Sequence, residues 1–216
     1  MNTYETFAKA NTVKGFIYNE NTRIHGLHGE VIPSVSQVVN PASKDYSKVP
    51  EKVLGNKRDL GEQLHKAIEL YTKNDLDEEN FKDEFEILIP PFESFKEYYL
   101  ESKGKKKIVL AVEQSFVNVK LKYCGKPDEV DEDEIVDYKL RPYDPVCDPL
   151  RMVAYEKLFV ECPPRKKTVV SFDLKGNRKI HDAEKKGAWG MFREMLKYYW
   201  GEIEFTELIE NWRKSI

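Results

Sequence analysis

The stretch Gly125-Lys126-Pro127-Asp128-Glu129-Val130, followed after an acidic turn by Ile135-Val136-Asp137-Tyr138-Lys139, is the most informative part of this chain. The second segment reads as a β-strand. Residues two apart on a strand project from the same face, so Asp137 and Lys139 should point the same way. Two carboxylates suit a divalent cation, and an ammonium group beside them can position a water and offset the charge of an attacked phosphodiester. The pattern therefore predicts a metal-dependent phosphodiester-cleaving centre.

The bulk composition is that of one soluble globular domain. The chain has 216 residues, of which 40% are hydrophobic and 34% charged. No apolar run approaches the about 20 residues that cross a bilayer, and the N-terminus lacks the pattern of a secretory signal. The three widely spaced cysteines favour a reducing cytosol, and three cannot supply the four ligands of an iron–sulfur cluster. We expect a cytoplasmic protein with no membrane contact and no iron–sulfur cluster.

The net charge of −3 is low for a protein that binds nucleic acid, because DNA binders usually present a basic surface. Two short runs, Lys103-Gly104-Lys105-Lys106-Lys107 and Arg165-Lys166-Lys167, are candidates for such a surface. Each is also compatible with an ordinary solvated turn.

Apolar spacing outside the first stretch predicts helices on both sides of a β-rich segment. Ser34, after a proline and before a short apolar run, is typical of a helix N-cap. Helices are expected over about 59–73, 78–101 with a break or kink at Pro90-Pro91, 148–161, 183–200 and 205–214. Strands are expected over about 16–18, 108–117, 120–124, 127–130, 134–140, 168–174 and 178–180.

This order predicts an α/β (α+β) fold in which a central mixed sheet is flanked by helices. We expect a single domain over residues 1–216. Its parts would be an N-terminal helical region at about 30–102, a catalytic β-meander at about 108–140 and C-terminal helices at about 148–216.

Four residue pairs follow one another along residues 30–160, and each lies on a helix or strand of the expected kind. The pairs are Gly61 and His65, Gly125 and Asp128, Asp137 and Lys139, and Arg151 and Tyr155. With the segment Pro33-Ser34-Val35-Ser36, they resemble the RecB-type branch of the PD-(D/E)XK nuclease superfamily, which includes phage recombination exonucleases. That branch has glutamine where this chain has Arg151. The resemblance implies a restriction-endonuclease-like core.

The resemblance also implies roles for individual residues. Mg²⁺ or Mn²⁺, two ions if both sites fill, would be held by His65, Asp128, Asp137 and the backbone carbonyl of Tyr138, and the histidine favours Mn²⁺. The catalytic residues would be Asp128, Asp137, Lys139 and Glu113, although Glu113 also fits an exposed position on an edge strand. Lys139 would orient the attacking water. Tyr155, Arg151, Ser34 and Ser36 would contact the substrate. Glu69, one turn after His65, is a weaker candidate ligand.

These roles predict a divalent-metal-dependent DNA exonuclease that resects linear duplex ends in phage-type recombination, in the cytoplasm of a bacterial host. A single-strand annealing protein would be a further partner. Two alternatives stay open: a single-strand-specific nuclease of repair or CRISPR adaptation, and an inactive nuclease fold that only binds nucleic acid. The sequence also leaves the polarity of cleavage and the oligomeric state open.

Overall fold

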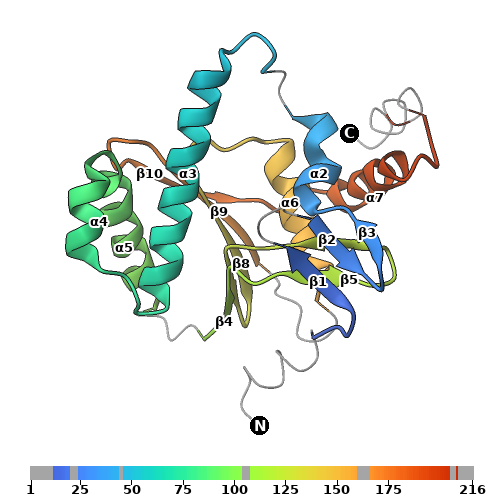
Figure 1. Cartoon of the computed structure of the whole chain (residues 1–216), viewed down its shortest axis with the longest axis horizontal. Helices are drawn as coiled ribbons and strands as arrows, with labels where there is room; N and C mark the ends of the chain where they lie inside the picture. The colour runs from blue at the N-terminus through green and yellow to red at the C-terminus, as the bar shows by residue number, and fades with distance from the viewer. Residues whose placement is uncertain are drawn as a thin grey trace.

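A five-stranded mixed sheet organises the chain (Figure 1), and the computed structural model describes residues 12–19, 24–43, 46–103, 108–159, 166–204 and 208. The strand order is β10-β9-β8-β7-β4, and all neighbours are antiparallel except β8 and β9, which are parallel. The strands are β4 (Val109–Val112), β7 (Glu129–Asp131), β8 (Glu134–Lys139), β9 (Lys166–Phe172) and β10 (Arg178–Asp182). Parallel neighbours need a long crossover connection, and helix α6 (Cys147–Glu156) lies in it. The expected mixed α/β architecture is confirmed.

Helices cover both faces of this sheet (Figure 1). Along β8, Ile135 joins one buried cluster, whereas Val136 and Tyr138 join the other, as the two-residue period of a strand requires. The first cluster packs on α2 (Val35–Val39), α6 and α7 (Ala188–Tyr199). The second packs on α3 (Glu51–Thr72), α4 (Glu78–Glu84) and α5 (Ile89–Lys103). Asp137 and Lys139 therefore lie on the α6 side of the sheet.

The expected continuous strand over 108–117 is wrong. Strand β4 ends at Val112, and Glu113 has a φ of 48°, which is incompatible with an extended strand. The chain then leaves the sheet and forms a separate hairpin of β5 (Phe116–Asn118) and β6 (Tyr123–Gly125). The expected meander is thus interrupted, and only its first and last parts belong to the main sheet. A third sheet contains β1 (Phe16–Asn19), β2 (Ile24–Leu27) and β3 (Glu30–Ile32).

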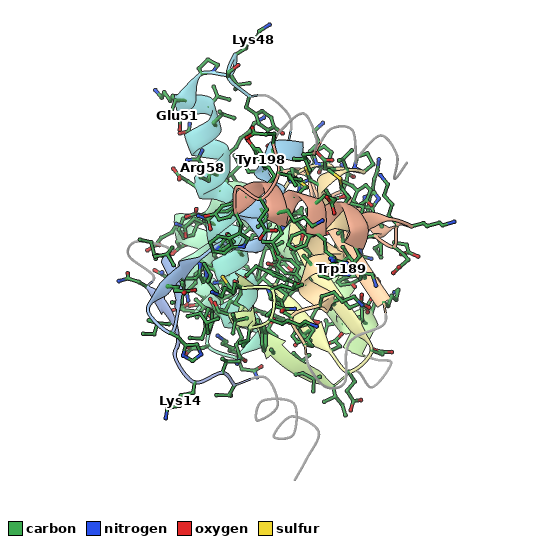
Figure 2. The ribbon with its side chains drawn as sticks, turned by 90° about the vertical axis from the view of Figure 1, so that its right-hand side faces the viewer. Lys14, Lys48, Glu51, Arg58, Trp189 and Tyr198 are labelled. Atoms are coloured by element: carbon green, nitrogen blue, oxygen red, sulfur yellow. The ribbon has the colours of Figure 1, made fainter. Side chains whose placement is uncertain are left out.

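Several helix boundaries also differ from expectation. Helix α3 begins at Glu51, directly after Pro50, and its first turns project beyond the body of the molecule, where Figure 2 labels Lys48, Glu51 and Arg58. Most residues of these turns are exposed, so the turns lack the apolar repeat from which a helix is predicted. The second expected helix breaks at Phe85, before a short 3-10 turn (Glu86–Leu88), rather than at Pro90-Pro91. The two prolines fall in the first turn of α5, where a missing N–H costs nothing.

Three further expectations concern the ends of elements. Helix α6 ends at Glu156, five residues before the expected 161. Apart from Leu208, the helix expected at 205–214 lies outside the described residues, as do the basic residues 104–107 and 165. Lys167 is buried and pairs with carboxylates, so it is not part of an open basic surface, whereas Lys166 pairs with Glu134 and is exposed. Among the residues described, no helix combines the length and apolar character that crossing a bilayer requires.

Candidate metal centre

Three elements bring acidic and imidazole groups together at one end of the main sheet. Val112 at the end of β4 pairs with Glu129 at the start of β7, so the next residues outward, Glu113 and Asp128, are neighbours. The Glu113 amide donates to the Asp128 carbonyl at 3.0 Å. His65, from α3, places Nδ1 3.4 Å from Glu113 Oε1 and 3.3 Å from Asp128 Oδ1. One ligand atom from each of these residues lies within 4.8 Å of the other two.

The left-handed backbone of Glu113 is part of this arrangement. A non-glycine residue at a φ of 48° carries a cost of about 1–2 kcal/mol. Such strained residues cluster at functional sites, where the surrounding structure holds them in place. Here the conformation ends the strand and lets the Glu113 carboxylate, which is 8% exposed, reach both His65 and Lys126.

The second half of the centre comes from β8. Continuing the pairing of Glu129 with Val136 places Asp128 opposite Asp137. Asp128 Oδ2 accepts the backbone N–H of Tyr138 at 2.6 Å, which ties this carboxylate to β8. Asp137 Oδ2 lies 2.8 Å from the Lys139 ammonium, yet neither oxygen of this buried carboxylate accepts a well-aligned hydrogen bond from the described residues. Asp137 lies outside the three-residue group, but its charge interacts with those of Asp128 and His65.

Opposite charges, rather than burial, decide the protonation of His65. Burial on its own would lower its pKa, but the charge of Asp128 and hydrogen bonds to Asp128 and Glu113 raise the pKa of His65 to about 10. Burial would raise the pKa of Glu113, and its contacts with His65 and Lys126 outweigh this and lower it. In the metal-free protein the imidazolium is therefore the cation that stabilises these two carboxylates.

Burial and charge act differently on the pair from β8. Burial is the main cause that raises the pKa of Asp137, and the charge of Asp128 adds to it against the opposing effect of Lys139. Burial would lower the pKa of Lys139, but the charges of Asp137 and Asp128 outweigh it and raise that pKa. Lys139 is thus held as an ammonium group beside the carboxylates.

The donor set fits a divalent cation. Carboxylate oxygens with one imidazole nitrogen suit Mg²⁺ or Mn²⁺, and the buried Asp137 oxygens, which accept no well-aligned hydrogen bond from the described residues, are further candidate ligands. Because metal ligands must be deprotonated, a cation would displace the proton of His65. The described residues include no cluster of cysteines that could act as metal ligands, and Cys124 and Cys147 are both buried free thiols.

The predicted substrate residues divide into two groups. Tyr155 is buried and packs directly on Gly125, where an added Cβ would lie 2.8 Å from the ring. The charges of Asp137 and Asp128 act on Tyr155, which lies near the centre. Ser34 instead caps α2 in a reciprocal hydrogen-bond pair with Gln37, and Ser36 is exposed on that helix. No contact described for these two serines reaches the metal centre.

The sequence analysis missed three residues next to the centre, and it named one candidate ligand, Glu69, that instead forms ion pairs elsewhere. Lys126 lies 2.7 Å from Glu113 Oε2, and only its place between Gly125 and Asp128 could have indicated it. The other two are Arg141 and Asp148, which form an ion pair, and Asp148 also pairs with Arg151. Glu69 pairs with Lys66 on its own helix at 3.0 Å and with Lys73, the residue that caps the end of that helix, at 2.6 Å.

Comparison of the sequence with protein-family models and with curated proteins finds no match to either. The chemistry of the site is therefore inferred from its own residues and geometry.

Proposed function

We propose that this protein is a divalent-metal-dependent nuclease that hydrolyses phosphodiester bonds in DNA. Its sheet and helices would form the restriction-endonuclease-like core of the PD-(D/E)XK superfamily, in the RecB-type branch. The observation that carries the proposal is the approach of His65, Glu113 and Asp128 from three different elements, with the Asp137–Lys139 ion pair on the neighbouring strand.

Each residue has a role that follows from its position. His65, Glu113 and Asp128 would hold the cation, with Asp137 and the Tyr138 carbonyl as further ligands. A divalent cation in this place supplies Lewis-acid stabilisation of the phosphate and makes bound water more acidic. The Lys139 ammonium, oriented by Asp137 at 2.8 Å, would offset negative charge on the attacked phosphate and align the water. Lys126 holds the Glu113 carboxylate at 2.7 Å and so fixes its direction.

Within this class, a DNA exonuclease that resects linear duplex ends in recombination is the form that the sequence resemblance favours. In that form it acts in the cytoplasm of a bacterial host, with a single-strand annealing protein as partner. Substrate form separates this from the alternatives: an exonuclease needs ends, and a repair-type enzyme would prefer single strands.

The test is cleavage of DNA by purified protein with Mg²⁺ or Mn²⁺. Wild type is compared with Asp128→Asn and Lys139→Ala on linear duplex, covalently closed circular and single-stranded DNA. We expect each variant to lower the rate by about a hundredfold or more, because each removes an electrostatic contact to the reacting phosphate or its cation. Asp83→Asn, on the exposed face of α4, and Lys186→Ala, in an exposed turn, are the matched controls and should retain the wild-type rate.

Two results would refute the proposal. Equal cleavage by all five proteins would indicate a contaminating nuclease. A folded wild type that cuts no DNA form with either metal would leave only the alternative in which the fold binds nucleic acid without hydrolysing it.

A further inference from the structure

Two arginines beside the metal centre share one buried carboxylate. Arg141, just after β8, donates to Asp148 from both terminal nitrogens, one of them at 3.1 Å from Oδ2. Arg151, on α6, donates from Nη1 to Asp148 Oδ1 at 3.1 Å. Asp148 is 0% exposed and also accepts the backbone N–H of Asp144 at 2.7 Å. With so many hydrogen bonds, Asp148 fixes the positions of both guanidinium groups.

The hydrogen bonds to Asp148 leave most donors of one guanidinium unused. One arginine is enough to neutralise one carboxylate, and Arg141 already does so through two nitrogens. Asp144, whose charge also acts on Arg141, accepts the backbone N–H groups of Val146 and Cys147 at the start of α6. Arg151 donates only one hydrogen bond among the described residues, so most of its five N–H donors are unused. Unused guanidinium donors are suited to a phosphate.

The arginine pair is next to the reacting groups. Arg141 follows Lys139 by two residues at the end of β8, and its charge interacts with that of Asp137. The charge of Arg151 acts on Lys139 and on the hydroxyl group of Tyr155. Arg151 and Tyr155 are four residues apart on α6 and so share one face of that helix. The arginine side chains are also open to a ligand, since that of Arg141 is 35% exposed and that of Arg151 is 19% exposed.

We propose that Arg141 and Arg151 bind a phosphate of the DNA strand adjacent to the scissile one, and that Asp148 is the positioning residue that holds them there. The inference rests on the proposed nuclease function. It adds Arg141 to the substrate-binding residues and Asp148 as the buried residue that positions both arginines. It also explains why Arg151 lies beside the buried carboxylate of Asp148. A neutral glutamine at position 151 would not need such a partner, whereas a buried carboxylate is stable only beside a cation.

The test measures binding of a fluorescently labelled single-stranded oligonucleotide by anisotropy, over a series of salt concentrations. All proteins carry Lys139→Ala, so that the oligonucleotide stays intact. We expect Arg141→Ala and Arg151→Ala each to weaken binding by about tenfold to a hundredfold. Each should also reduce the slope of log affinity against log salt by about 0.7, the value for one lost phosphate contact on a single strand.

Three further variants separate binding from stability. Arg193→Ala removes an exposed arginine on α7 and should leave both affinity and slope unchanged. Arg151→Lys keeps the charge beside Asp148, so it should retain the slope while losing part of the affinity. Asp148→Asn keeps the shape of the buried side chain and should weaken oligonucleotide binding. Mn²⁺ affinity, measured by calorimetry, should stay within about twofold in the arginine variants.

The outcomes distinguish this inference from the proposed function. If folded Arg141→Ala and Arg151→Ala bind the oligonucleotide as Arg193→Ala does, the phosphate contact is refuted, even if the wild type cuts DNA. A parallel loss of Mn²⁺ affinity would show a purely structural role and would also refute it. A wild type that neither binds nor cuts DNA refutes the proposed function itself.

Discussion

Replacing Gly125 by alanine tests the packing between β6 and α6. A Cβ on Gly125 would lie 2.8 and 2.9 Å from two ring carbons of Tyr155 and 3.0 Å from a methyl carbon of Leu158. Tyr155 and Leu158 are 6% and 2% exposed, so neither can move into solvent. Overpacking of this kind costs about 1–3 kcal/mol. We therefore expect Gly125→Ala to lower the free energy of unfolding by about 2 kcal/mol.

Gly55→Ala is the matched control, because it is the same chemical change with the opposite expectation. Gly55 lies within α3 and an added Cβ would meet nothing within 4 Å. Alanine there should stabilise the helix by about 0.5–1 kcal/mol. In urea denaturation followed by circular dichroism, the two variants should differ by about 1.5–4 kcal/mol in unfolding free energy.

A double variant tests whether the Tyr155 ring causes the loss of stability in Gly125→Ala. Tyr155→Ala opens space beside Gly125, so Gly125→Ala should cost at least about 1 kcal/mol less in that background than alone. Equal stability of Gly125→Ala and wild type, or additive effects in the double variant, would refute the contact between Gly125 and Tyr155 as the reason for the glycine.

Three other measurements check the electrostatics and burial. Since its pKa is raised to about 10, His65 must lose a proton to bind a cation, so Mn²⁺ affinity by calorimetry should rise from about pH 6 to about pH 9. This dependence should weaken in His65→Gln, and a flat profile in the wild type would contradict the assignment. Cys124 is 0% exposed and burial raises its pKa to about 12, so mass spectrometry should find it unmodified by iodoacetamide at about pH 8 until urea unfolds the chain. Lys167 is 4% exposed and pairs with Glu156 and Glu184, so Lys167→Ala should cost about 2 kcal/mol in urea denaturation. Burial would lower the pKa of Lys167, but its hydrogen bonds raise it, so this contribution should persist below about pH 10.5 and fall as pH rises through the higher folded-state pKa. A loss between about pH 6 and pH 8, where the partner glutamates stay ionised, would contradict it.

The features of this protein that depend on local residue spacing could be predicted from its sequence. The two-residue period of a strand places Asp137 and Lys139 on one face, and the structure has them 2.8 Å apart. Apolar alternation and helical spacing likewise indicated a mixed sheet between helices, because burying one face of each element requires that pattern. Ser34 was recognisable as a helix cap for the same reason, since its hydrogen bond reaches only Gln37.

Only the tertiary structure decided which side chains meet. Nothing local to Glu113 signals a left-handed residue that ends β4, because the strain is held by the neighbouring strand and by contacts with His65 and Lys126. His65 and Asp128 are 63 positions apart along the chain, and how close they lie in space depends on how α3 packs against the sheet. The burial of Asp148 between Arg141 and Arg151 likewise requires α6 to lie against the end of β8. Long-range packing sets these distances, and residue spacing along one element carries no information about them.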